Sequence, residues 1–234
     1  MLSLPEKVGS TFNHMSSTIL NSKKNTYVYI DGFNFYYGCF KDPLRSSWQR
    51  YKWLNLEKLC IELFPNNTIQ QIKYYTADIT NRPPDKQGDR QKTYLNALLT
   101  LPRIKIIKGR FLGPKVVRMP ACDEQGNYLG RSTTVLKTEE KGSDVNLAVD
   151  LLYDAVKNLY DCAVVISNDS DLISPINIVI NDFHKPVGWA NPHSKPSREI
   201  SNLIRFRKTI NESLLRNCQF PPVVDGRFEK PSSW

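Results

Sequence analysis

Short apolar runs alternate with amphipathic stretches along most of this 234-residue chain. The runs are rich in Val, Ile and Tyr, which favours β-strands. The stretches repeat apolar residues at three- and four-residue spacing, which favours helices. The pattern predicts strands over 27–30, 69–77, 104–108, 162–167 and 187–190, and helices over 51–64, 90–99, 144–159, 172–181 and 199–204.

This order of strands and helices predicts an α/β fold with a mainly parallel sheet covered on both faces. The length suits one domain, with a flexible N-terminal arm over 1–25, a main body over 26–210 and a surface tail over 211–234. Residues 112–134 are expected to form a hairpin or a long loop that either grips a substrate or makes a dimer contact. The helix over 144–159 is expected to begin after an N-cap at Ser143 and to bury Val145, Ala148, Val149, Leu152 and Val156.

Composition narrows the class of protein. The chain has 32 Lys and Arg against 23 Asp and Glu, a formal net charge of +9, which favours a polyanionic partner such as nucleic acid over a merely soluble basic surface. It has no apolar run long enough for a membrane span and no apparent signal peptide. Its five cysteines form no C-x-x-C pair, which indicates reduced thiols and a cytoplasmic location.

The three histidines, His14, His184 and His193, lack metal-ligand spacing on a helix. With no zinc-type cysteine pattern either, any bound metal would be held by oxygen. Oxygen ligands favour Mg²⁺ or Mn²⁺ over Zn²⁺.

Four carboxylates fall where one fold would gather them. Asp31 follows the first strand, Asp169 and Asp171 follow the fourth, and Asp144 opens the helix before the fourth strand. The carboxyl ends of parallel strands share one edge of a sheet, where ligands bind. Acids crowded in one pocket raise each other's pKa, and divalent cations remove that conflict. Two metals about 4 Å apart activate a water and stabilise a leaving oxygen of a phosphodiester.

Each motif also has an ordinary structural reading. Asp-Ser-Asp after a strand is commonly a turn or helix cap, and Asp31-Gly32 a turn. Asp144 alone is typical of an acid in the first turn of a helix, where it interacts favourably with the helix dipole. Lys141-Gly142-Ser143 resembles part of a phosphate-binding loop but lacks the preceding glycine that such a loop requires. Glu139 and Glu140 either contribute to the site or are solvated, and solvation is favoured. Asp150 is turned away from Asp144 on the helix. Phe33, Phe35, Tyr36 and Tyr37 suit base stacking, with at least two of them expected in the core.

Three stretches resemble the NYN family, the LabA-like bacterial proteins within the PIN-like nuclease superfamily. They are YVYIDGFNFYYG at 27–38, EEKGSDVNLAVDLLYDA at 139–155 and VVISNDSDLISPI at 164–176. The resemblance runs in the family's order over about residues 26–222. It implies a PIN-like three-layer α/β/α sandwich and a nuclease domain over 26–210.

The resemblance also implies roles for individual residues. Asp31, Asp144, Asp169 and Asp171 match the family's acids, which implies that they are catalytic and ligate Mg²⁺ or Mn²⁺. Asn34 matches an Asn that orients a carboxylate or a water. Ser167 and Asn168 match polar residues that contact phosphate or water behind the ligands.

The function expected from residues and resemblance is metal-dependent endonucleolytic hydrolysis of single-stranded RNA, leaving 5′-phosphate and 3′-hydroxyl ends. The alternative is a non-catalytic RNA-binding or regulatory protein on the same fold. Toprim-type sites need a Glu where Asp31 stands, and haloacid-dehalogenase-type phosphatases need Asp-x-Asp after the first strand, so both classes are disfavoured. A homodimer and a further protein partner are left open, and no membrane partner is expected.

Overall fold

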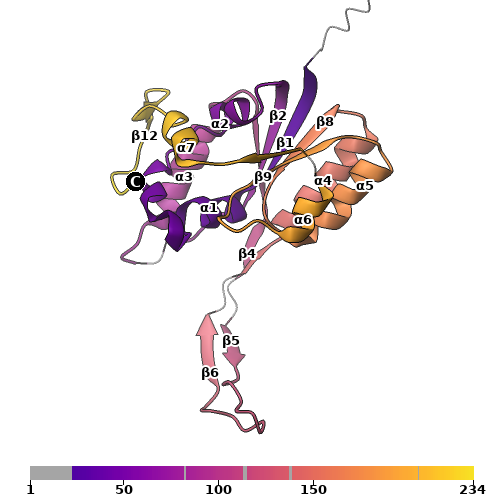
Figure 1. The fold of residues 1–234 in the computed structure, drawn as a ribbon. Helices are drawn as coiled ribbons and strands as arrows, with labels where there is room; N and C mark the ends of the chain where they lie inside the picture. Colours follow the sequence, from indigo (N-terminus) through magenta and orange to yellow (C-terminus); the bar gives the residue numbers. More distant parts are fainter. Residues whose placement is uncertain (1–22, 82, 113–114, 137–138, 205) are drawn as a thin grey trace, which may run out of the picture.

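A six-stranded parallel sheet forms the centre of the molecule (Figure 1). The computed structural model describes residues 23–234 except 82, 113–114, 137–138 and 205. The expected N-terminal arm therefore lies almost wholly outside the described residues. In the strand order β10–β9–β8–β1–β2–β3, the strands are β1 (Lys24–Asp31), β2 (Asn67–Thr76), β3 (Ile104–Lys108), β8 (Cys162–Ile166), β9 (Val187–Asn191) and β10 (Phe206–Thr209).

Helices cover both faces of this sheet, which confirms the predicted three-layer α/β/α sandwich (Figure 1). Side chains alternate along each strand, so that Val28 and Ile30 pack into one core and Tyr29 into the other. The first face carries α1 (Gly32–Phe40), α2 (Leu56–Leu63), α3 (Gln87–Leu98) and α7 (Glu212–Asn217), and the second α4 (Ser143–Val156), α5 (Ile173–Asn181) and α6 (Arg198–Leu203).

Short elements connect the layers. Two 3-10 helices, Pro43–Tyr51 and Ser170–Leu172, precede α2 and α5. Three small antiparallel pairs join β4 (Arg110–Leu112) to β7 (Glu139–Lys141), β5 (Lys115–Arg118) to β6 (Thr133–Leu136), and β11 (Val223–Val224) to β12 (Phe228–Glu229). The β5–β6 hairpin projects from the body of the molecule, so the described residues from 115 onward form a hairpin, one of the two conformations expected for 112–134 (Figure 1).

The predicted buried face of α4 is wrong. Val145, Val149 and Val156 are exposed, whereas Leu147 and Leu151 are fully buried. Ala148 and Leu152, also expected inside, are half-buried against the core. The helix is turned because its inner face also buries the charged Asp154, which hydrophobic periodicity assigns to solvent.

The segment 211–234 is not a surface tail. It forms α7 and the β11–β12 pair, and it contributes Leu215, Cys218, Phe220 and Val224 to the core. The backbone carbonyl of Pro221 accepts a hydrogen bond of 2.7 Å from the Trp53 indole. The prolines of this segment favoured the prediction that it lies on the surface. Its few apolar side chains instead complete the first core.

Among the described residues, no helix is both long and apolar enough to cross a membrane.

Candidate active site

Three of the predicted acids meet at the carboxyl ends of the central strands. One carboxylate oxygen from each of Asp31, Asp144 and Asp169 lies within 4.8 Å of the others. The pairing of β1 with β8 explains this, because Ile30 is opposite Ile166 in the parallel register. The two strands therefore end together, and the N-terminus of α4 brings in the third acid.

Asp31 is held in place by the start of α1. Its Oδ1 accepts a hydrogen bond of 2.9 Å from the backbone N–H of Asn34, and so it caps the helix. Its Oδ2 accepts a hydrogen bond of 3.1 Å from the Ser167 hydroxyl. Gly32 lets α1 approach the sheet, since a Cβ there would lie 2.5 Å from the Tyr75 carbonyl oxygen. Asp31-Gly32 is therefore a strand-to-helix junction in which the carboxylate is fixed twice.

The acids destabilise one another's charged forms. The pKa of Asp31 is raised to about 6, mainly by burial and also by the charges of Asp144 and Asp169, while the hydrogen bonds from Asn34 and Ser167 oppose the shift. The pKa of Asp144 is raised by burial, then by Asp169, Glu140 and Asp171. The cluster thus concentrates negative charge at a half-buried position.

Asn34 joins α1 to the loop after β8. Its Oδ1 accepts hydrogen bonds from the backbone N–H of Asn168, at 2.8 Å, and lies 3.0 Å from Nε2 of His193. The Ser167 hydroxyl lies 3.2 Å from the backbone N–H of Asp169, from which it accepts. Asn34 and Ser167 thus fix the segment that carries Asp169. His193, which has no metal-ligand spacing in the sequence, reaches this network through tertiary structure.

The Asn168 side chain forms hydrogen bonds to the segment before α6. Its Oδ1 accepts a hydrogen bond of 2.7 Å from the backbone N–H of Ser197, and its Nδ2 donates to the Lys195 carbonyl at 3.2 Å. These contacts connect the loop after β8 to the start of α6. The side chain therefore braces the loop.

Asp171 lies outside the three-acid group. Its side chain is exposed, and its backbone N–H donates to Asp169 Oδ1 at 3.0 Å. Its charge still raises the pKa of Asp144. Asp171 therefore acts on the cluster through electrostatics and through the turn that it shares with Asp169.

Glu140, for which solvation was favoured over a place at the site, is half-buried next to the start of α4 and raises the pKa of Asp144. Its Oε1 accepts a hydrogen bond of 3.1 Å from the backbone N–H of Ser143, at the first turn of α4. The residue expected to cap this helix, Ser143, follows the true N-cap, Gly142, whose φ of 97° suits glycine. The Ser143 hydroxyl is buried without a hydrogen-bond partner in the described part of the chain. The available sequence signal was an acid just before a helix N-terminus.

Asp150 belongs to a separate buried network. Its Oδ2 accepts a hydrogen bond of 2.8 Å from the Tyr75 hydroxyl and lies 3.3 Å from Lys73 Nζ. Lys73 also pairs with Asp154 at 2.6 Å, and the Tyr29 hydroxyl donates to the same carboxylate at 2.7 Å. This network ties α4 to β1 and β2, and it fixes the helix that presents Asp144.

The three-acid group fits a hard divalent cation. Its donors are carboxylate oxygens, the ligands that Mg²⁺ and Mn²⁺ prefer. Burial, and to a smaller extent the neighbouring carboxylates, raises the pKa values of Asp31 and Asp144, and a cation bound between the acids would offset both effects. The cluster is therefore a candidate metal site.

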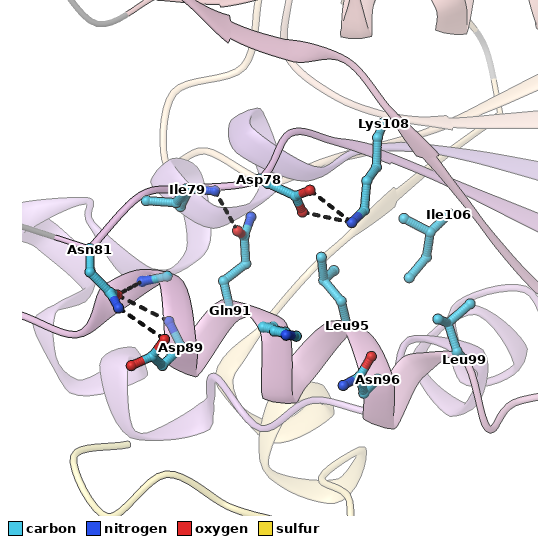
Figure 2. Close-up of a pocket in the computed structure, with 12 residues that line it drawn as sticks. Asp78, Ile79, Asn81, Asp89, Gln91, Leu95, Asn96, Leu99, Ile106 and Lys108 are labelled. Carbon is cyan, nitrogen blue, oxygen red and sulfur yellow. Dashed lines mark hydrogen bonds and ion pairs between the residues drawn. The ribbon is translucent and has the colours of Figure 1, made fainter. Parts of the chain in front are cut away.

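Two cavities flank α3. The one of about 440 Å³ starts at Gly32 and Phe33, directly after Asp31, and runs between α1, the end of β2 and α3. The other, of about 580 Å³, lies on the far side of Gln91, between α3 and β3 (Figure 2). Gln91 separates them by hydrogen bonding to the backbone of Ile79, at 2.8 Å, and of Ala77, at 2.9 Å.

The sandwich and its strand-end acids define an α/β protein of the PIN-like class. The NYN domain model matches residues 25–203, and the chain belongs to the NYN domain family. That membership supports a nuclease-type hydrolase at the coarse level.

Two further comparisons bear on this chain. It is 32% identical to 6-hydroxy-3-succinoylpyridine 3-monooxygenase HspA of Pseudomonas putida, over 89% of this chain and 75% of that protein. The crystal structure of a Vibrio parahaemolyticus protein of unknown function matches with a TM-score of 0.51 and 17% identity, over 81% of this chain and 94% of the other. The second likeness supports the fold alone.

Proposed function

We propose that this protein is a metal-dependent endoribonuclease acting on single-stranded RNA. The observation that carries the proposal is the meeting of Asp31, Asp144 and Asp169 within 4.8 Å in an NYN domain. The net charge of +9 adds a long-range attraction for the RNA backbone. The case for Asp171 as a metal ligand is weaker than that for the other three acids, since its side chain is exposed and lies outside their group.

Asp31, Asp144 and Asp169 would hold Mg²⁺ or Mn²⁺, with Asp171 tuning their charge. When bound, the cation would supply Lewis-acid activation of water and would neutralise charge developing at phosphorus. The chain's own contribution is positioning, because Asn34 and Ser167 fix the carboxylates of Asp31 and the loop of Asp169.

The proposed reaction is hydrolysis. The bond between phosphorus and the 3′ oxygen breaks, water supplies a hydroxyl to phosphorus, and its other proton ends on the 3′ oxygen. The products carry 5′-phosphate and 3′-hydroxyl ends, and the 2′-hydroxyl takes no part. Product ends with 2′,3′-cyclic phosphate would contradict this route.

The test is cleavage of a labelled single-stranded RNA in Mn²⁺, Mg²⁺ or EDTA. We expect the wild type to cut only with metal and Asp169→Asn to lose at least about 100-fold in rate, the order seen when a charge-stabilising group is removed. Asp171→Asn is the nearby control and should lose less. Asp182→Asn, an exposed acid at the end of α5, should cut like the wild type. Equal cutting by wild type and Asp169→Asn would indicate a contaminating nuclease.

A second candidate function is monooxygenation of a small hydroxylated pyridine. The observation that favours it is the 32% identity, over most of both chains, to the Pseudomonas putida monooxygenase. Such a reaction inserts one oxygen atom of O₂ into the substrate and reduces the other to water with two electrons. The aromatic and basic lining of the 440 Å³ cavity suits a planar acid of that kind.

Its test is incubation with 6-hydroxy-3-succinoylpyridine, O₂ and NADH as the two-electron reductant. Substrate-dependent NADH oxidation, with one ¹⁸O atom from ¹⁸O₂ incorporated into the pyridine product in mass spectrometry, would support this candidate. If that product forms and RNA stays intact with every metal, the nuclease proposal is wrong. RNA cleavage with no oxygenated product would exclude the second candidate.

A further inference from the structure

The cavity of about 440 Å³ begins at the residues that follow Asp31, although none of the three acids lines it. Its first lining residues, Gly32 and Phe33, follow Asp31 in the chain and form the first turn of α1. An RNA strand with one phosphate at the acids would therefore run toward this cavity along the start of α1. The cavity has two further properties that match a nucleotide.

One property is an aromatic wall. Phe33, Tyr36 and Tyr37 from α1, with Tyr74 from β2, line the cavity. Phe33 is half-buried and is held edge-on by Phe111, with ring centroids 5.3 Å apart. Tyr37 is 57% exposed, although α1 is otherwise packed on the sheet. Aromatic rings on which a base can stack are the usual means of binding single strands.

The other property is an excess of positive charge. Lys41, Lys52 and Arg90 line the cavity against one acid, Asp85, which pairs with Arg90 at 2.5 Å. Lys52 is half-buried, and in the described part of the chain no carboxylate lies within ion-pair distance of it. Burial lowers the pKa of Lys52, and the charges of Lys41 and Arg90 lower it further. An anion bound here would relieve that repulsion.

The larger cavity has neither property. Its Lys108 already pairs with Asp78 at 2.7 Å, and Leu95, Leu99 and Ile106 form much of its wall (Figure 2). The match to a base with a phosphate is therefore specific to the smaller cavity.

We propose that the cavity between α1, β2 and α3 is a nucleotide subsite, with the base against Tyr37 and Phe33 and a phosphate bound by Lys52 and Lys41. The assignment of this nucleotide to an RNA substrate rests on the proposed nuclease function. The binding itself does not, because it needs neither the metal nor cleavage.

The experiment is calorimetric titration of the full chain in EDTA. The probes are a nucleoside 5′-monophosphate, the nucleoside alone, inorganic phosphate, and a pyridine carboxylate. We expect the nucleotide to bind best. Lys52→Gln should weaken the nucleotide and phosphate by roughly tenfold, as expected for loss of one charge-assisted contact. Tyr37→Ala should weaken the nucleotide several-fold and leave phosphate unchanged.

Matched variants keep the result interpretable. Lys41→Gln is exposed and serves as a second test if Lys52→Gln does not fold. Lys92→Gln, an exposed lysine of the larger cavity, should bind like the wild type. Unchanged nucleotide affinity in both Lys52→Gln and Lys41→Gln would overturn the subsite.

Other outcomes separate the two proposals. Tighter binding of the pyridine carboxylate than of any nucleotide would overturn the subsite and favour the monooxygenase function. RNA cleavage without nucleotide binding in this cavity would leave the nuclease standing and remove the subsite. Nucleotide binding without RNA cleavage in any metal would support the subsite and contradict the proposed nuclease function.

Discussion

At the scale of the residue, Asp31 combines a structural role with an unfavourable charge. It caps α1, yet burial and the neighbouring acids raise its pKa to about 6. The folded chain therefore binds the Asp31 proton more tightly than the unfolded chain, whose carboxyl has its ordinary pKa near 3.8. Metal-free stability should consequently fall as pH rises through about 6.

Replacing Asp31 by Asn should stabilise the metal-free protein at pH 8. Asn keeps the cap and removes the buried charge, so we expect a gain of about 1–3 kcal/mol in the free energy of unfolding. The gain should shrink as pH falls through 6 and disappear near pH 4. Urea denaturation in EDTA across this pH range measures it.

Metal provides the control for that experiment. Mn²⁺ should stabilise the wild type, because a ligand that binds only the folded state raises its stability, and should have little effect on Asp31→Asn. An Asp31→Asn protein that is less stable than the wild type in EDTA at pH 8 would contradict the electrostatic account.

The positions of the acids in the sequence were enough to predict that the acids meet. The residues that surround the acids in space could not be predicted in this way. Asp31 and Asp169 follow adjacent parallel strands, so the general geometry of such sheets predicts that they meet. Lys41, Lys52 and Arg90 come from three separate elements and share no pattern in the sequence. His193 reaches Asn34 across 159 positions. Only the folded chain shows these groupings.

At the scale of the element, α4 is oriented by a buried ion pair. The Lys73 side chain is 8% exposed and that of Asp154 is 3% exposed. Periodicity alone allowed either of two faces of α4 to be buried, because Val, Leu and Ala occur on both. The ion pair with Lys73 on β2 decides which face of α4 is buried. The sequence of α4 alone does not contain that information.

Removing Lys73 should destabilise the protein strongly. Lys73→Met leaves the Asp154 charge buried without its partner, so we expect a loss of about 3–5 kcal/mol. Asp154→Asn leaves the lysine with only the partly exposed Asp150, 3.3 Å away, and should destabilise the protein less than Lys73→Met. The double variant should lose clearly less than the sum, because neither charge remains unpaired. Chemical denaturation of the four proteins gives the coupling.

The exposed pair Lys108–Asp78 is the matched control. Its side chains are 51% and 69% exposed, so Asp78→Asn should change stability by no more than about 1 kcal/mol. Simple additivity of Lys73→Met and Asp154→Asn would mean that the pair does not orient α4.

At the scale of the whole molecule, the domain does not end where its last predicted helix ends. The alternation of strands and helices established the layers, but β10 and the segment beyond it carry too few apolar residues to show a pattern. The core depends on that segment all the same. Phe220 packs 5.7 Å from the Trp53 ring, and Trp234 stacks edge-on against Trp53 and Tyr94.

Phe220→Ala should therefore lower the free energy of unfolding by about 3–5 kcal/mol, as for other buried aromatic residues. Truncation after residue 210 should leave no cooperative unfolding transition, because it removes this residue with Leu215, Cys218 and Val224. The measurement is thermal denaturation followed by near-ultraviolet circular dichroism, which reports the packing of the tryptophans.

The projecting β5–β6 hairpin, in contrast to the C-terminal segment, is expected to contribute little to stability. Its described side chains Val117, Met119, Tyr128 and Leu129 are all exposed, so replacing 119–132 by Asn-Gly should change stability by less than about 1 kcal/mol. In the truncation experiment, a protein that ends at residue 210 and still melts cooperatively like the wild type would show that residues 26–210 fold by themselves. A large loss from the hairpin replacement would show that this arm supports the sheet edge from which β4 and β7 extend, and with it the position of Asp144.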